Sequence, residues 1–226
     1  MNMIYCLEDD DAIRNLILYT LGSAGFESRG FAESGAFWRA VDQQTPQLVL
    51  LDIMLPGEDG IQVLARLRAR PSTAGIPVIM TTAKGTEFDK VTGLDQGADD
   101  YLVKPFGMME MISRIKAVLR RAAPEQNAGV LRIGSLTLDP AEHTVTAEGR
   151  RVQLTLKEYE LLHLFMANPG RAFDRETLLQ KIWNADWTGE TRTVDAHIRS
   201  LRAKLGSAAD CIETVRGVGY RMEDKS

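Results

Sequence analysis

Residues 3–21 read MIYCLEDDDAIRNLILYTL. The apolar run at 3–7 is followed by a cluster of carboxylates and then by an amphipathic run over 12–21. A short apolar run bounded by polar residues is typical of a buried strand, and apolar residues at helical spacing are typical of a helix that covers a sheet. This stretch therefore predicts one strand–helix unit of an α/β fold.

The same unit recurs four more times before residue 121. The apolar runs and the amphipathic runs that follow them are 28–31 with 36–41, 48–51 with 61–67, 78–80 with 88–94, and 101–103 with 108–119. Alternating strands and helices favour a parallel sheet. We therefore expect a flavodoxin-like five-stranded parallel sheet of order 2-1-3-4-5 in a first domain, 1–121.

The pattern changes after residue 121. The polar stretch AAPEQNAG at 122–129 has no apolar periodicity and is interpreted as a linker. Short strands are expected at 131–133, 136–138, 144–147 and 152–154, helices at 157–167, 175–183 and 193–205, and a glycine-punctuated hairpin at 212–222. This order predicts an α+β winged helix-turn-helix domain over 130–226.

Composition agrees with two modest domains. The chain has 226 residues, 44% of them hydrophobic and 26% charged, which is ordinary for a globular protein. Because no apolar run approaches the ~18 residues that cross a bilayer, we expect no membrane insertion and a cytoplasmic location. Cys6 and Cys211 lie far apart without CxxC spacing, so we expect two buried thiols rather than a disulfide or a zinc site.

Acidic residues follow two strands that the expected order makes neighbours. Glu8 and Asp9 follow the first strand and Asp52 follows the third. Ligands bind outside the carboxyl ends of parallel strands where the strand order reverses. Carboxylates crowded at such a point stay ionised at little cost when a hard cation joins them, and oxygen ligands favour Mg²⁺.

The remaining strand ends supply matching groups. Thr82 follows the fourth strand with a hydroxyl, and Lys104 follows the fifth with an ammonium suited to a phosphoryl oxygen. Taken singly, an acidic cluster is often only a helix N-terminus, and Thr82 and Lys104 are ordinary strand-end residues. The presence of a suitable polar group at each of four strand ends favours a functional site.

Four motifs resemble the receiver domain of bacterial two-component response regulators: LEDD at 7–10, LDIMLPG at 51–57, TTA at 81–83 and GADDYLVKPF at 97–106. The resemblance spans the first domain. It implies that Asp52 is the phosphoacceptor and that Mg²⁺ is bound by Asp9, Asp52 and the Met54 carbonyl, with Glu8 acting directly or through water. It further implies that Thr82 and Lys104 hold the phosphoryl group and that the Lys104–Pro105 peptide is cis.

The resemblance also implies a switch. The Thr82 hydroxyl would move toward the phosphoryl group and Tyr101 would turn into the vacated space, which alters the face of the fourth helix, fifth strand and fifth helix. Pairs on that face resemble the intersubunit pairs of the OmpR/PhoB subfamily, which implies a homodimer on phosphorylation; the alternative is a set of solvated charges. These pairs are Lys90 with Glu110, Asp100 with Arg114, and Asp99 with Arg121.

Basic charge in the second domain is local. The net charge of the chain is −4, yet residues 192–204 hold Arg192, Arg199, Arg202 and Lys204 against only Asp195. At helical spacing, the apolar stripe from Val194 to Leu205 turns inward, and we expect an outward arc of Thr193, His197, Arg199 and Ser200. The helix at 175–183, the turn at Gly189 and a glycine-flanked wing bearing Arg216 complete the pattern, so residues 193–205 are predicted to be a recognition helix. The alternative is a solvated basic helix.

Residues 130–222 resemble the effector domain of the OmpR/PhoB subfamily, through LTLKEYELL at 154–162, RTVDAHIR at 192–199 and TVRGVGY at 214–220. The resemblance implies phosphate or sugar contacts from Trp183, Arg192, Thr193, His197 and Arg202. It places base reading near Ser200 and minor-groove contact at Arg216, with Arg199 and Thr214 also at the DNA. The implied partners are a sensor histidine kinase, tandem half-sites in double-stranded promoter DNA, and RNA polymerase.

Two alternatives remain. An aspartyl-phosphate hydrolase would want a second aspartate two residues after Asp52, where Met54 stands, and no nucleotide-binding or nucleophile-elbow motif is present. A DNA-binding regulator that uses the receiver fold only for dimerisation would not need the set Glu8, Asp9, Asp52, Thr82 and Lys104. We therefore expect no enzyme beyond self-phosphorylation from phosphodonors and self-dephosphorylation.

Overall fold

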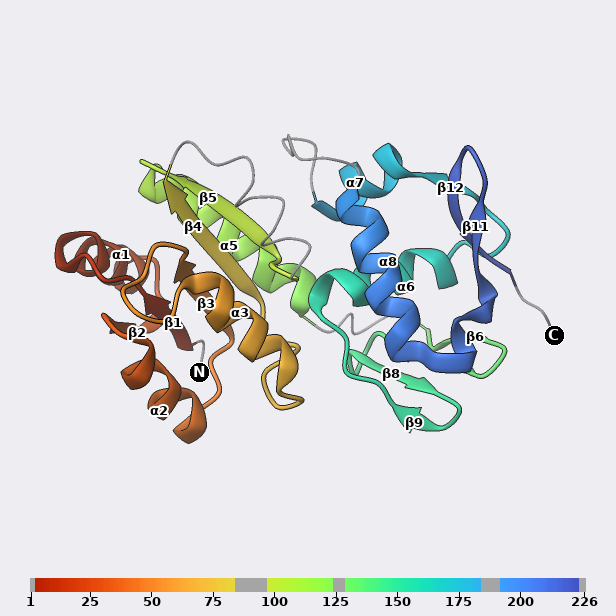
Figure 1. The fold of residues 1–226 in the computed structure, drawn as a ribbon, viewed down its shortest axis with the longest axis horizontal. Helices are drawn as coiled ribbons and strands as arrows, with labels where there is room; N and C mark the ends of the chain where they lie inside the picture. Colours follow the sequence, from red (N-terminus) through yellow and green to blue (C-terminus); the bar gives the residue numbers. More distant parts are fainter. Residues whose placement is uncertain (1–2, 84–96, 124–128, 184–191, 224–226) are drawn as a thin grey trace. The chain divides into compact units, whose positions relative to one another are not determined.

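The computed structural model describes residues 3–83, 97–123, 129–183 and 192–223. The chain divides into two compact units, Met1–Arg121 and Ala122–Ser226, which are described separately (Figure 1). The predicted helix at 88–94, the turn at Gly189 and most of the linker lie outside the described residues. The linker therefore stays a prediction.

The first unit is built on a parallel sheet of five strands: β1 (Met3–Leu7), β2 (Glu27–Phe31), β3 (Leu48–Asp52), β4 (Val78–Ala83) and β5 (Asp100–Lys104). Their order is β2-β1-β3-β4-β5, which confirms the predicted topology. Every residue of β3 is buried because helices cover both faces of the sheet. The reversal of strand order thus falls between β1 and β3.

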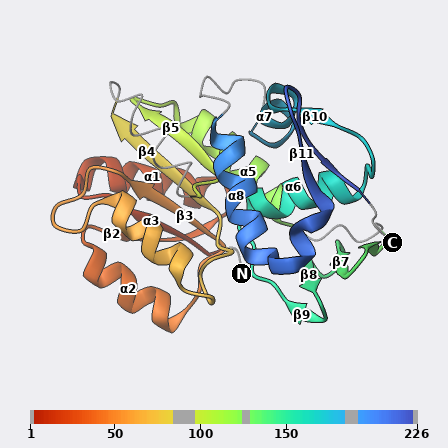
Figure 2. The same ribbon diagram turned by 45° about the vertical axis from the view of Figure 1, so that its right-hand side comes forward.

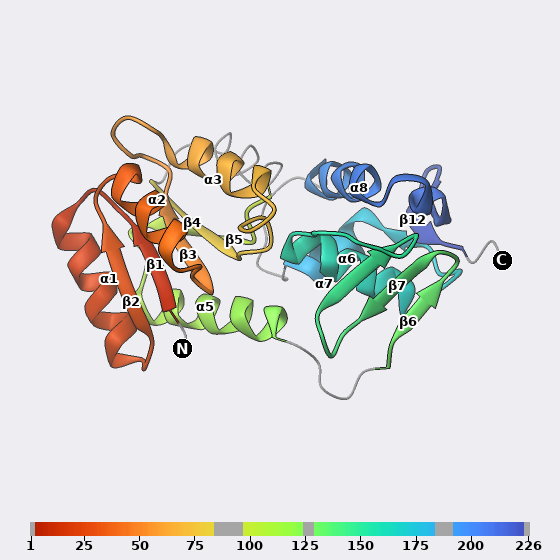
Figure 3. The same cartoon turned by 90° about the horizontal axis from the view of Figure 1, so that it is seen from below.

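Four described helices cover this sheet: α1 (Asp11–Ser23), α2 (Ser34–Gln43), α3 (Gly60–Ala69) and α5 (Met108–Ala122). Figure 3 shows α1 and α5 on one face and α2 and α3 on the other. Asp10 caps α1, because its side chain accepts hydrogen bonds from the amides of Ala12 and Ile13. The carboxylate of Asp10 is therefore engaged in capping the helix, whereas Glu8 and Asp9 lie at the end of β1.

The second unit begins with an antiparallel sheet of β6 (Leu131–Ile133), β7 (Leu136–Asp139), β8 (Thr144–Ala147) and β9 (Arg150–Arg151). The prediction of a fourth strand at 152–154 is wrong, because the strand begins two residues earlier, at Arg150, and ends at Arg151. Glu148 and Gly149 form a tight turn with φ of 52° and 75°, so Arg150 already pairs with Ala147. Thr155 then caps the next helix, which ends the strand.

Three helices form the body of this unit: α6 (Leu156–Met166), α7 (Arg175–Trp183) and α8 (Arg192–Leu205). The short helix η1 (Gly206–Cys211) leads to a second sheet of order β10-β12-β11, with β10 at Phe173–Asp174, β12 at Gly219–Met222 and β11 at Ile212–Val215. Figure 2 shows α8 beside α6, followed by the β11 hairpin. The predicted winged helix is confirmed, with β10 as an additional strand.

Glycine is required where β12 meets β10. A Cβ at Gly219 would lie 2.1 Å from the Phe173 carbonyl oxygen, so no larger residue fits without moving a strand.

Among the described helices, none has the length and apolar character needed to cross a bilayer.

The two cysteines differ in environment, so the expectation that both are buried holds for Cys6 alone. Cys6 is buried in β1, whereas Cys211 is partly exposed. Burial, reinforced by the charge of Glu8, raises the pKa of Cys6 to about 12. Since only the thiolate reacts, a rise of about three pKa units lowers the reactivity of Cys6 roughly a thousandfold.

We therefore expect one thiol to react with iodoacetamide at pH 8 in the folded protein and both to react after unfolding in guanidinium. Peptide mass mapping identifies the labelled position, which should be Cys211. Labelling of Cys6 at the same rate as Cys211 would contradict the buried position of β1.

Candidate functional site

Carboxylates from two neighbouring strands meet at one end of the first sheet. Asp52 is the last residue of β3, and Glu8 and Asp9 directly follow β1. One ligand atom from each of the three residues lies within 4.8 Å of the others. Glu8 is 1% exposed and Asp52 is 4% exposed, whereas Asp9 is exposed. The parallel pairing of β1 with β3 brings these residues together, as the sequence predicted.

Lys104 ends β5 and reaches into the same cluster. Its Nζ lies 2.7 and 2.9 Å from the two carboxylate oxygens of Glu8 and 2.8 Å from Oδ2 of Asp52. Burial acts to lower the pKa of Lys104, but the hydrogen bonds to Asp52 and Glu8 outweigh it, and the pKa is raised. Lys104 is therefore a fixed positive charge beside Asp52.

The cluster has the chemistry of a hard-cation site. Burial raises the pKa of Glu8 and the charge of Asp52 adds to the rise, although the Lys104 hydrogen bond opposes it. The amide of Met54 donates to Oδ1 of Asp52 at 3.2 Å, so the Met54 peptide is adjacent to the cluster. Three carboxylates with a nearby peptide group fit Mg²⁺, and Asp9, Asp52 and Glu8 are the residues that would hold it.

Thr82 and Tyr101 lie on the two strands beyond β3. Asp52 pairs with Thr81 in the register, so Thr82 extends one residue past Asp52 toward the same end of the sheet. Thr82 is opposite Val103, next to Lys104, and Tyr101 is opposite Met80. Both Thr82 and Tyr101 are buried. The peptide between Lys104 and Pro105 is cis, as expected.

Gly60 is a part of this site that the sequence analysis missed. It opens α3, and a Cβ there would lie 2.0 Å from the Asp52 carbonyl oxygen and 2.8 Å from the Cα of Ile53. Its amide donates to the Ile53 carbonyl at 3.0 Å. The sequence signal that could have indicated this position is the glycine directly after Asp59, the residue that caps α3. Glycine is needed there because the backbone approaches too closely for any side chain.

The predicted intersubunit residues that the structure describes have partners within one protomer. Arg114 lies 3.1 Å from Asp100 and 3.0 Å from Glu110. Asp99 is 2% exposed and accepts hydrogen bonds from Arg68 at 2.9 Å and from the Val78 amide at 2.7 Å. Arg121 donates to the Ala117 carbonyl. Lys90 lies outside the described residues, and the three pairs stay predictions.

The outward arc predicted for α8 is wrong in part. Thr193 and His197 are buried, because α8 packs against both α6 and α7 and its inward face is wider than one apolar stripe. The His197 ring meets Trp183 edge to face at a centroid distance of 4.9 Å. Ser200 is partly exposed, and its hydroxyl donates to the Glu158 carboxylate at 2.6 Å. Arg192 and Arg199 remain on the exposed face.

Two buried polar atoms lie at the end of α7 and in the first turn of α8. Trp183 Nε1 and Thr193 Oγ1 have no hydrogen-bond partner among the described residues. A buried polar group without a partner costs about 1–3 kcal/mol. These two residues are among those that the sequence analysis placed against DNA phosphates.

The wing is tied to α8 by Arg202. Its guanidinium donates to the Ile212 carbonyl at 2.7 Å and to the Thr214 hydroxyl at 3.1 Å. Thr214 and Arg216 are exposed on the hairpin, and Gly217 has φ of 75° at its tip. Arg202 therefore positions the wing, a structural role in addition to the predicted phosphate contact.

Comparison with known proteins covers both units. Residues 4–116 match the family model described as response regulator receiver domain, and residues 149–222 match transcriptional regulatory protein, C terminal. The phosphate regulon transcriptional regulatory protein PhoB of Pseudomonas aeruginosa is 42% identical over 224 residues, with 99% of this chain and 98% of that protein covered. The chain belongs to the OmpR/PhoB subfamily of two-component response regulators.

Other relatives of this response regulator agree. The sensory transduction protein RegX3 of Mycobacterium tuberculosis is 40% identical over 229 residues, covering 99% of this chain and all of that protein. Among solved structures, a single-site mutant of RitR has a TM-score of 0.74 at 27% identity, and the match covers 99% of this chain and 100% of that chain. The response regulator therefore joins a receiver to a winged-helix DNA-binding domain.

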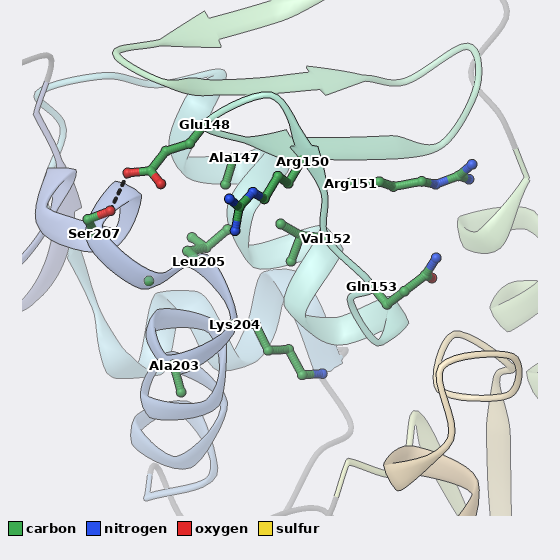
Figure 4. Close-up of a pocket in the computed structure, with 11 residues that line it drawn as sticks. Ala147, Glu148, Arg150, Arg151, Val152, Gln153, Ala203, Lys204, Leu205 and Ser207 are labelled. Atoms are coloured by element: carbon green, nitrogen blue, oxygen red, sulfur yellow. Dashed lines mark hydrogen bonds between the residues drawn. The ribbon is translucent and has the colours of Figure 1, made fainter.

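A cavity in the second unit is lined by residues of β8, β9 and the C-terminal end of α8. Its volume is about 460 Å³. Figure 4 shows Arg150 pointing into it and Arg151 pointing away. Glu148 and Ser207 hydrogen-bond across its rim. No predicted site residue lines this cavity.

Proposed function

We propose that this response regulator is a cytoplasmic, phosphorylation-dependent transcriptional regulator, and that Asp52 accepts a phosphoryl group from a sensor histidine kinase. The observation that carries the proposal is the position of the Asp52 carboxylate, which lies 2.8 Å from Lys104 Nζ beside two further carboxylates. An anionic nucleophile next to a fixed cation suits attack on a phosphoryl group whose charge must be offset.

The residues have separate roles in the proposed transfer. One Asp52 oxygen attacks the phosphorus of a phosphohistidine in line with the P–N bond; the O–P bond forms as the P–N bond breaks, and the histidine ring leaves with the electron pair and takes a proton from solvent. Lys104 turns from Asp52 to a phosphoryl oxygen, and the Thr82 hydroxyl donates to another. Bound Mg²⁺ would offset the remaining negative charge, held by Asp9, Asp52 and Glu8 with the Met54 carbonyl.

Phosphorylation is proposed to bring two copies together. Movement of Thr82 and Tyr101 would alter the face that carries Asp100, Glu110 and Arg114. Because Arg114 already pairs with Asp100 and Glu110 within one protomer, dimerisation would exchange these contacts for intersubunit ones. A partly exposed pair such as Arg114 with Glu110 contributes at most about 1 kcal/mol, so such pairs would specify the register of the dimer more than its affinity.

The second unit is proposed to bind tandem half-sites in promoter DNA, where RNA polymerase is the further partner. The proposal is supported by the exposed basic face of α8 and by the exposed Arg216 on the wing, whose guanidinium groups suit phosphate oxygens. The net charge of −4 makes affinity for DNA modest, and a dimer would raise it through two linked contacts.

Intact-mass analysis tests the proposed transfer. We expect the protein to gain about 80 Da on incubation with acetyl phosphate and Mg²⁺, and to gain nothing when EDTA removes the metal. The absence of any gain would favour the alternative in which the receiver fold serves only for dimerisation. Continuous release of phosphate from a phosphomonoester would favour a hydrolase.

A further inference from the structure

We propose that Arg199, rather than Ser200, reads base edges in the major groove, and that it selects a guanine in each half-site. This inference rests on the proposed DNA binding and assigns the residue that gives it sequence specificity. It follows from the contacts that the two residues of α8 make with the residues around them.

Ser200 is held toward the body of the domain. Its hydroxyl donates to Oε1 of Glu158 at 2.6 Å, and Glu158 is only 2% exposed. The other Glu158 oxygen accepts from Lys204 Nζ at 2.6 Å and from the Thr155 amide at 2.7 Å. A buried carboxylate that keeps three donors is costly to disturb, so Ser200 and Lys204 both point to α6.

Arg199 is on the exposed side of α8, and no described residue forms an ion pair or hydrogen bond with it. The acid at helical spacing is Asp195, four residues earlier. Asp195 is already held by Arg175 at 2.7 Å and by the Tyr220 hydroxyl at 2.7 Å. The guanidinium of Arg199 is therefore available to an external acceptor.

The residues around Arg199 allow close approach to the groove floor. Ala196 and Ala203 lie one turn before and one turn after it, so they share its face of α8. Small side chains let the helix enter deeply, and a methyl group fits against the methyl of thymine. Arginine forms two hydrogen bonds with O6 and N7 of guanine, the commonest specific contact in the major groove. We therefore expect a guanine with thymine nearby in each half-site.

Selection from random double-stranded DNA tests this assignment, using the full-length protein treated with acetyl phosphate and Mg²⁺. We compare wild type with Arg199→Ala and Ser200→Ala. The matched control is Arg151→Ala, because Arg151 is an exposed arginine on β9 that points away from α8 (Figure 4). Thermal unfolding of each variant shows that it is folded.

We expect wild type to prefer guanine roughly 5- to 150-fold at one position of the half-site. Arg199→Ala should lose the preference at that position alone, whereas Ser200→Ala and Arg151→Ala should keep it. Uniform weakening on all sequences by Arg199→Ala, or loss of the guanine by Ser200→Ala, would overturn the assignment and leave the proposed DNA binding intact. A wild-type protein that selects no sequence would overturn both.

Discussion

Replacing Asp52 by asparagine is expected to abolish the gain of about 80 Da from acetyl phosphate and Mg²⁺. The amide is not a nucleophile, so no acyl phosphate forms. The substitution keeps the shape of the side chain and an oxygen that accepts from the Met54 amide, and Lys104 keeps its contacts with Glu8. We therefore expect a folded variant whose affinity for tandem half-sites does not change when acetyl phosphate is added.

Asp42→Asn is the matched control for this prediction. Asp42 lies on α2, its side chain is 64% exposed, and it pairs with Arg70 at the surface. The same chemical change there should leave the mass gain and the rise in DNA affinity intact. If Asp52→Asn gained mass as wild type does, the phosphoacceptor would be another residue, and peptide mapping of the modified protein would locate it.

The strand-end cluster was predictable from sequence because it depends on topology alone. Alternating apolar and amphipathic runs imply parallel strands, and the order that places β1 beside β3 brings Glu8 to Asp52 although the two lie far apart in the chain. Lys104 joins them because β5 runs parallel to the other strands and so ends at the same edge of the sheet. No side-chain packing needs to be known for these conclusions.

What the sequence could not predict concerns packing between elements and the type of one turn. Thr193 and His197 were placed outward because helical spacing defines only the direction of a side chain, whereas burial depends on how many neighbours α8 has. The partners of Asp99 could not be predicted for the same reason, since Arg68 reaches it from α3, 31 residues earlier. The strand predicted at 152–154 lies earlier, at 150–151, because the tight turn at Glu148 and Gly149 sets the register in which this strand pairs with β8.

Gly60→Ala is expected to be the most damaging single-methyl change in the first unit. The new Cβ would lie 2.0 Å from the Asp52 carbonyl oxygen, and both groups are backbone-anchored, so the start of α3 or the end of β3 must move. Overpacking of this kind costs about 3 kcal/mol. A displacement of Asp52 by about 1 Å from Lys104 would slow phosphoryl acceptance by up to about a hundredfold. Urea unfolding and the time course of the mass gain measure the two effects.

Gly22→Ala separates steric displacement from the general effect of replacing glycine. Gly22 lies in α1, and a Cβ there meets no atom within 4 Å. Alanine is a better helix former than glycine by up to about 1 kcal/mol, so this variant should be slightly more stable and should accept the phosphoryl group at the wild-type rate. Equal behaviour of the two variants would contradict the close approach of α3 to β3. Loss of stability by Gly60→Ala with a normal rate would show that Asp52 keeps its position while α3 moves.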